Sequence, residues 1–414
     1  MGLRNSFPKY LLLLLSALGS TKAHAEYWPQ LLGPGRDGVY RGRDLAPSWP
    51  DSGLPVLWQK KVGKGFSNPA VVDSHLILFH RIGDKEIVEA LGPETGSSFW
   101  SFSYPTTYHD DFGFDDGPRA SPIIAEGRVY TFGAQGILHC LELGTGRKIW
   151  SVDTHTTLGV KKGFFGAAGS PLLQGKAVFL NAGGRSGAGL AAFDKDSGKL
   201  LWTSTDDEAS YASPISATFG GKLHILFFTR SGLVGTDSGS GEVLFRFPWR
   251  SRNRASANAA TPLTVGDLIF LSASYRTGAV VLRVKGRELE TLWSSDEVLS
   301  NHYATSVHHE GYLYGFHGRQ EYAPSLRCVD LKTGKVRWSQ DRFGSGTVTL
   351  ADDRLIILRE KGELILAQAD PRRYQQISKA RILTGTVRAY PALAGGLLYA
   401  RNEDTVVCVD LNKR

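Results

Sequence analysis

A pattern of 11 residues that recurs along the chain constrains the fold more than any other feature of the sequence. The clearest copies are CLELGTGRKIW, AFDKDSGKLLW and CVDLKTGKVRW, which end at Trp150, Trp202 and Trp338. Weaker copies end at Trp100, Phe245 and Trp293. Because successive ends lie 43 to 52 residues apart, the chain is expected to be built from one repeated supersecondary unit.

Each copy has the chemistry of a β-hairpin. Alternating apolar residues form a strand, and a turn follows in which an aspartate such as Asp194 bonds backbone amides and a glycine such as Gly198 supplies a positive φ. A second hairpin lies upstream and begins at a small-x-Pro motif, with the prolines at Pro122, Pro171, Pro214, Pro262 and Pro391. Four strands with a period in the forties predict the blade of a β-propeller.

The number of blades follows from the small-x-Pro positions. Pro69 starts a first blade, whereas Ser306 and then Val348 or Thr349 occupy the proline slot in the sixth and seventh blades. The eighth blade reaches residues 408–411 and then lacks a fourth strand. Residues 54–62, which contain Trp58, resemble that missing strand. We therefore predict an all-β, single eight-bladed β-propeller over residues 54–414, closed by an N-terminal strand that removes an exposed sheet edge, after a lead-in segment at 26–53.

The first 25 residues have the pattern of a secretory signal peptide. Arg4 and Lys9 precede a short apolar run, and small residues at Ala23 and Ala25 mark a cleavage site. The run is too short to span a bilayer, and the segment has no cysteine to carry a lipid. A periplasmic or extracellular protein without a transmembrane anchor is expected. Cleavage lowers the formal charge from 48 − 40 = +8 to 45 − 40 = +5, which does not indicate binding to nucleic acid.

The unit from Ala192 to Trp202 resembles the tryptophan-docking motif of the pyrroloquinoline-quinone (PQQ) repeat superfamily. The stretch from Trp28 to Tyr40 resembles the start of secreted PQQ-like propellers. The resemblance covers essentially the whole chain after the signal peptide. It implies a propeller like those of the non-enzymatic outer-membrane assembly factor B and of the quinoprotein dehydrogenases, whose functions differ although their fold is shared.

Two functions are consistent with this resemblance. The first is a non-enzymatic binding or scaffolding propeller, a monomer that presents a loop rim and a central opening to a protein, peptide or glycan of the cell envelope. The second is an oxidoreductase that binds PQQ, with Ca²⁺, in the central opening. The quinoprotein alcohol dehydrogenases that the chain resembles carry two adjacent cysteines, whereas Cys140, Cys328 and Cys408 each lie in a different blade and are expected to be small buried fillers. The sequence therefore favours the non-enzymatic function, without a cofactor.

Candidate binding residues lie in the loops that join the outer strand of one blade to the inner strand of the next, because these loops open on one face. The residues of this predicted rim are His109, Asp110, Asp111, Asp115, Asp116, Arg119, Arg250, Arg252, Arg254, Asn301, His302 and Arg388. An alternative stays open for each, namely a solvated charge or, for His302, a hydrogen-bonded structural residue.

The stretch YHDDFGFDD, residues 108–116, has no counterpart in the other blades. Its four aspartates, Asp110, Asp111, Asp115 and Asp116, repel one another unless something compensates their charge. Ca²⁺ would suit clustered carboxylates, although the spacing is not that of an EF-hand; pairing with arginines or plain solvation is the alternative. Phe112 and Phe114 are expected to pin the loop to the propeller while the aspartates face outward.

Overall fold

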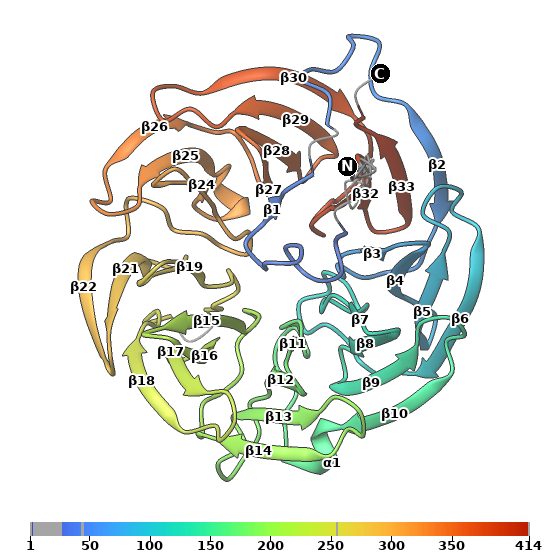
Figure 1. The fold of residues 1–414 in the computed structure, drawn as a ribbon, viewed down its shortest axis with the longest axis vertical. Coiled ribbons are helices and arrows are strands. Elements are labelled where there is room, and N and C mark those ends of the chain that lie inside the picture. Colours follow the sequence, from blue (N-terminus) through green and yellow to red (C-terminus); the bar gives the residue numbers. More distant parts are fainter. Residues whose placement is uncertain (1, 3–26, 43–44, 254–255, 413–414) are drawn as a thin grey trace.

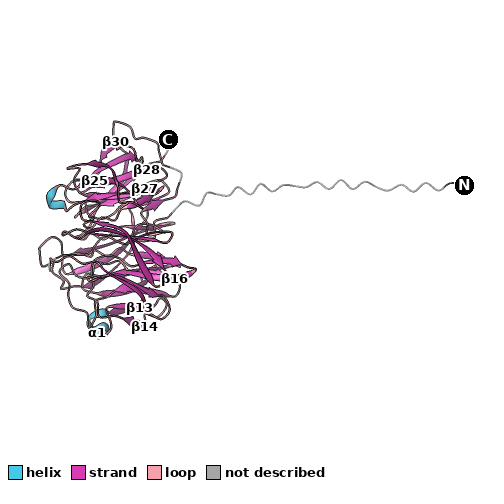
Figure 2. Ribbon diagram, turned by 90° about the vertical axis from the view of Figure 1, so that its left-hand side faces the viewer, coloured by secondary structure: helices cyan, strands magenta, loops and turns pink. Residues whose placement is uncertain are grey.

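The structure, a computed structural model, describes residues 2, 27–42, 45–253 and 256–412. Eight β-sheets surround one axis (Figure 1), and the ring seen from the side is a flattened disc (Figure 2). The predicted eight-bladed, all-β propeller is confirmed. The predicted signal peptide, apart from Gly2, lies outside the described residues. Among the described residues, no helix combines the length and the apolar character that a bilayer crossing requires.

Each blade consists of four strands, numbered here from the axis outward. Blade 1 comprises β3 (Ala70–Val72), β4 (His75–Ile82), β5 (Lys85–Leu91) and β6 (Ser98–Pro105). Blade 2 comprises β7 (Ile123–Ala125), β8 (Arg128–Phe132), β9 (Ile137–Glu142) and β10 (Lys148–Asp153). Blade 3 comprises β11 (Leu172–Gln174), β12 (Ala177–Asn181), β13 (Leu190–Asp194) and β14 (Leu200–Ser204). Blade 4 comprises β15 (Ile215–Phe219), β16 (Lys222–Phe228), β17 (Gly232–Asp237) and β18 (Val243–Pro248).

The remaining blades follow the same order. Blade 5 comprises β19 (Leu263–Val265), β20 (Leu268–Ala273), β21 (Gly278–Lys285) and β22 (Glu288–Ser295). Blade 6 comprises β23 (Val307–His309), β24 (Tyr312–His317), β25 (Ser325–Asp330) and β26 (Val336–Gln340). Blade 7 comprises β27 (Gly346–Ala351), β28 (Arg354–Arg359), β29 (Glu363–Gln368) and β30 (Gln375–Arg381), with β1 (Val39–Tyr40) added at its inner edge. Blade 8 comprises β31 (Ala392–Ala394), β32 (Leu397–Arg401), β33 (Thr405–Asp410) and β2 (Val56–Lys61). Two short helices, α1 (Thr154–Leu158) and η1 (Gln320–Tyr322), lie in loops.

Tryptophans at the outer strands tie neighbouring blades together. The indole Nε1 of Trp100 donates to the carbonyl oxygen of Leu143 in the next blade at 2.7 Å, and that of Trp150 donates to Lys195 O at 3.0 Å. A Cβ added to Gly198 would lie 2.7 Å from the Trp150 ring. The glycine of the repeat turn is therefore needed for close approach as well as for its positive φ.

The ring closes as predicted. β2 pairs antiparallel with β33, and Trp58 lies opposite Cys408. Arg401, which is buried, donates from Nη2 to Gly63 O at 2.6 Å and thereby links blade 8 to the chain just beyond β2. The N-terminal strand thus supplies the fourth strand of the last blade.

The lead-in segment crosses the propeller axis, which the sequence did not indicate. Trp28 forms a bridge with Val71 of blade 1. Gly38 O accepts a hydrogen bond from Leu350 N of blade 7 at 2.8 Å, next to the parallel pairing of β1 with β27. Figure 1 shows this blue segment inside the ring. Residues 28–40 therefore lie across the centre of the ring.

Candidate functional site

A cavity of about 400 Å³, called here the axial cavity, lies at the centre of the ring. Residues that precede the inner strands of seven blades line it, namely Asn68, Ser121, Ser170, Ser213, Thr261, Thr305 and Tyr390. Leu31 and Leu32 of the lead-in segment also line it. Because contributions come from all around the ring, the cavity lies on the propeller axis.

Aromatic side chains form one wall of the axial cavity. Phe112 and Phe114 lie with their ring centroids 6.3 Å apart, and Phe165 lies 5.4 Å from Phe112. Phe165 also packs edge-on against Tyr211 at 5.2 Å. Phe112 and Phe114 are 54% and 50% exposed, so the wall offers a large apolar area to a ligand.

Three arginines line the cavity, and each has a carboxylate partner. Arg119 Nη2 lies 2.8 Å from Asp110 Oδ2, Arg388 Nε lies 2.6 Å from Glu360 Oε1, and Arg319 Nη2 lies 2.7 Å from Glu321 Oε1. The Arg388 guanidinium also lies 5.4 Å from the centroid of the Phe114 ring. These pairs hold the arginines in place beside the aromatic wall.

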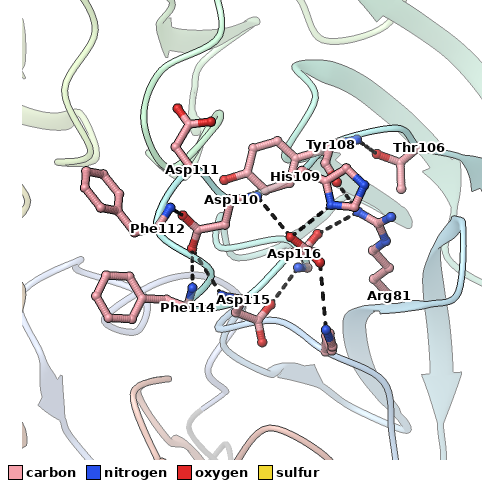
Figure 3. Close-up of polar contacts among 12 residues, drawn as sticks. Arg81, Thr106, Tyr108, His109, Asp110, Asp111, Phe112, Phe114, Asp115 and Asp116 are labelled. Atoms are coloured by element: carbon pink, nitrogen blue, oxygen red, sulfur yellow. Dashed lines mark hydrogen bonds and ion pairs between the residues drawn. The ribbon is translucent and has the colours of Figure 1, made fainter.

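The loop at residues 108–116 owes its shape to Asp110 (Figure 3). The carboxylate of Asp110 is fully buried. It accepts hydrogen bonds from the backbone N–H groups of Phe112, Phe114 and Asp115 at 2.9, 3.1 and 3.1 Å. With Arg119 as a fourth donor, it holds the backbone of a short loop whose amides would otherwise lack acceptors.

The expectation that the phenylalanines pin the loop while the aspartates face outward was wrong. Phe112 and Phe114 are half exposed, whereas Asp110 and Asp115 are buried. Figure 3 shows both rings pointing away from the carboxylate of Asp116 and from Arg81. The physical reason is that a tight loop has many backbone N–H groups, and buried carboxylates satisfy several of them at once.

The other three aspartates have different surroundings. Asp115 accepts from Gly65 N at 3.1 Å and from Gly117 N at 2.6 Å. The backbone N–H of Asp110 donates to Asp116, and this bond lowers the pKa of the Asp116 carboxyl. Asp111 is exposed and pairs with Lys162 at 2.5 Å. In the described part of the chain, no group of three His, Cys, Asp or Glu side chains could hold a metal ion.

His302 is the predicted rim residue that joins Arg119 and Arg388 at the axial cavity. Its Nε2 lies 2.9 Å from Tyr275 Oη, and its Nδ1 contacts Gln320 Oε1. Burial lowers the pKa of the His302 imidazole. Its neutral ring is therefore a fixed polar group in the cavity wall.

Other predicted rim residues lie away from the axial cavity. Asn301 is buried, and its Nδ2 donates to Phe316 O at 2.8 Å, which is a structural bond. Arg250 and Arg252 are exposed and do not line the cavity, while Arg254 lies outside the described residues. His109 and Asp111 line a second cavity of about 890 Å³ beside the 108–116 loop. The structure therefore does not gather the predicted residues into one rim.

Sequence reasoning missed several residues of the axial cavity. Leu31 and Leu32 were assigned to a segment preceding the propeller, and Arg319 with Tyr275 lies in hairpin loops inside blades rather than between them. The Arg319 guanidinium lies 4.4 Å from the centroid of the Tyr275 ring. Only the length of these hairpin loops distinguishes them in the sequence.

Comparisons of the sequence with known proteins identify two kinds of relative. A family model described as outer membrane protein assembly factor BamB matches residues 84–340. The quinohemoprotein alcohol dehydrogenase ADH-IIG of Pseudomonas putida is 27% identical over 156 residues, which are 36% of this chain and 21% of that enzyme. The match thus spans about a fifth of the length of that relative.

Solved structures of both kinds share the fold. BamB from Moraxella catarrhalis superposes with a TM-score of 0.62 at 16% identity, covering 87% of this chain and 98% of that one. A quinohemoprotein alcohol dehydrogenase from Comamonas testosteroni superposes with a TM-score of 0.66 at 14% identity, covering 94% of this chain and 81% of that one. Identities this low show a shared fold alone. Because the family model spans more than half of the 414 residues, this chain belongs to the family of outer membrane protein assembly factor BamB.

Proposed function

We propose that this protein is a non-enzymatic binding propeller that receives a segment of a protein or peptide partner in its axial cavity. Phe112 and Phe114 carry the proposal: they are half exposed at the cavity, although the loop that bears them is fixed by the buried Asp110. Rigidly presented aromatic side chains beside a concave surface are typical of binding sites, because little conformational entropy is lost on binding.

The setting of the protein is part of the same proposal. A signal peptide at residues 1–25 would export the chain to the periplasm or beyond, and we propose that it acts there as a monomer without a resident cofactor. The partner would be a protein or peptide of the cell envelope; a glycan is the further possibility that the sequence leaves open. The membership of the BamB family supports a protein partner.

Paired variants test this function. Tagged wild-type protein, the double variant Phe112→Ser/Phe114→Ser and the control Phe99→Ser are each crosslinked in a native envelope fraction and analysed by mass spectrometry. Phe99 is 53% exposed on β6 and does not line the axial cavity, so it controls for a general loss of surface hydrophobicity. We expect one set of partners to be retained by wild type and Phe99→Ser and lost by the double variant. Equal capture by all three proteins would refute the proposal.

A PQQ-dependent oxidoreductase is the second candidate, because part of the chain matches a quinohemoprotein alcohol dehydrogenase. The aromatic wall and the arginines of the axial cavity suit a planar polyanion. Ca²⁺ accompanies the quinone in the enzymes that the chain resembles, and the described residues offer no group of three ligating side chains for it. These residues therefore do not fit the quinone with its calcium ion. Incubation with PQQ and Ca²⁺ tests this: a bound quinone spectrum with dye reduction would favour the enzyme.

A further inference from the structure

The base of the axial cavity is a ring of polar residues, one before each of several inner strands. The backbone N–H of one residue donates to the side chain of the next one around the ring. Ser121 N donates to Ser170 Oγ and Ser170 N to Ser213 Oγ, both at 2.8 Å. On the opposite side, Tyr390 N donates to Asn68 Oδ1 at 2.8 Å. These bonds position the side chains around the axis without using their donor hydrogens.

Several donors of this ring are left without an acceptor. Asn68 Nδ2 and Ser121 Oγ are buried atoms with no hydrogen-bond partner among the described residues. Asn68 is 4% exposed and Ser121 is 1% exposed, and both line the axial cavity. The hydroxyls of Ser170 and Ser213 accept the bonds named above, so their own hydrogens remain available. Unsatisfied buried donors are costly, and an acceptor placed on the axis would remove that cost.

A buried positive charge stands behind this ring. Arg36 of the lead-in segment is 4% exposed, and its Nη1 donates to Pro171 O at 2.7 Å while Nη2 donates to Ser170 O at 3.4 Å. Within the described part of the chain it has no ion pair, and burial lowers the pKa of its guanidinium to about 9. A buried cation without a counter-ion is unfavourable. An anion bound at the ring would offset this charge.

The charges around the cavity point the same way. The described residues that line it include three arginines, Arg119, Arg319 and Arg388, and one carboxylate, Glu321. That carboxylate is paired with Arg319. An acidic group that enters the cavity therefore approaches donors and cations on its way to the base.

We propose that the polar ring at the base of the axial cavity, formed by Asn68, Ser121, Ser170 and Ser213, binds the free C-terminal carboxylate of a peptide. The apolar side chains that precede this carboxylate would then pack against Phe112 and Phe114. A carboxylate presents two oxygens that accept several N–H and O–H donors at once, and capture of a terminal carboxylate is a known mode of peptide recognition. This inference rests on the proposed function and narrows its ligand to peptides with a free C-terminus.

Two peptide libraries test the inference. Both consist of fluorescein-labelled hexapeptides with apolar residues randomised over the last three positions; one ends in a free carboxylate and the other in a carboxamide. Fluorescence anisotropy with the full-length protein should show binding about 10-fold tighter for the acid library, which corresponds to about 1.4 kcal/mol. Equal binding of the two libraries would overturn the carboxylate inference and leave the proposed function standing, whereas no binding of either library would overturn both.

A matched pair of variants assigns the effect to the ring. Ser121→Ala removes a donor that has no partner in the protein, so folding stability should be kept while the preference for the acid library falls about 3- to 10-fold. Thr131→Val is the control, because Thr131 Oγ1 is also buried without a partner but does not line the cavity. An unchanged preference in Ser121→Ala would contradict the inference. Phenylacetate is the small-molecule competitor, and binding as tight as that of the peptides would show that a free carboxylate, not a peptide, is the ligand.

Discussion

Trp58, on the strand that closes the ring, donates its indole Nε1 hydrogen to the carbonyl oxygen of Pro93 at 2.7 Å. A Cβ added to Gly96 would lie 2.7 Å from the same indole ring. The closing strand is therefore joined to blade 1 by the kind of contact that Trp100 and Trp150 make between later blades. Closure thus uses both the pairing of β2 with β33 and a contact to blade 1.

Trp58→Ala should lower the free energy of unfolding by about 3 kcal/mol, at the low end for a tryptophan because the side chain is only half-buried. Trp58→Phe keeps the ring contact and loses the hydrogen bond, so a cost of about 1 kcal/mol is expected. Chemical denaturation measures both values. Leu57→Ser, on the same strand and 47% exposed, is the control and should change stability by less than about 0.5 kcal/mol.

Deletion of residues 54–62 is the stronger test of closure. It leaves β33 with an unpaired edge, and we expect aggregation on expression. A soluble, monomeric deletion variant with an unchanged melting temperature would contradict closure by β2.

The three cysteines should react slowly with a thiol reagent until the protein unfolds. All three are free and buried. Burial raises the pKa of the Cys140 thiol to about 11 and the pKa values of Cys328 and Cys408 to about 12. Because the thiolate is the reactive form, labelling with a chromogenic disulfide at pH 8 should be complete only in denaturant. Rapid labelling of the native protein would show that one of these strands opens.

Asp110→Asn should loosen the 108–116 loop, whereas Asp111→Asn should not. Asp110 is fully buried and bonds three backbone amides and Arg119, so the loss of its charge should cost about 1–3 kcal/mol. Asp111 makes an exposed pair with Lys162, which is worth at most about 1 kcal/mol. Thermal melts of the two variants measure the difference, and equal melting temperatures would contradict the assigned role of Asp110.

Calcium separates the two readings of the aspartates that the sequence left open. The carboxylates of Asp110 and Asp115 already accept hydrogen bonds, and a cation would have to displace those donors. We therefore expect neither binding heat in calorimetry nor a change in melting temperature when Ca²⁺ is added to wild type or to Asp111→Asn/Asp115→Asn. Calcium-dependent stabilisation of the wild type alone would restore the cation site.

The repeat made the fold predictable because each blade solves the same packing problem. A strand beginning after a proline, a turn glycine such as Gly198 and an aromatic residue such as Trp150 recur at a fixed spacing. Ring closure followed from counting strands, since a propeller with a missing strand would expose an edge. These features are local in sequence, and local rules were enough.

The candidate site was harder to predict because no repeat encodes it. The lead-in segment looks like an appendage in sequence, yet Leu32 and Arg36 lie at the centre of the ring. The direction in which Phe112 and Asp110 point is set by which backbone amides need acceptors, and that depends on the path of the loop. Polarity alone suggested the opposite orientation, since carboxylates are usually the exposed groups.

His139 should make the stability of the protein depend on pH between about 7 and 4. Its ring is buried between Tyr104 and Phe102, with centroid distances of 4.3 and 5.2 Å, and its Nδ1 has no partner among the described residues. Burial, with a smaller contribution from Lys148, lowers the pKa of His139 from 6.5 to about 4. In this pH range the unfolded chain binds a proton that the folded protein does not, so stability is lost as the pH falls. The shift corresponds to about 3 kcal/mol at pH 4.

His139→Phe keeps an aromatic ring at this position and removes the proton, so its melting temperature should fall less than that of the wild type between pH 7 and pH 4. Some dependence should remain, because burial also lowers the pKa of His317 to about 4. His109→Phe is the control, since the His109 side chain is 77% exposed, and its curve should follow that of the wild type. Parallel curves for wild type and His139→Phe would show that the folded protein protonates His139 as readily as the unfolded chain does.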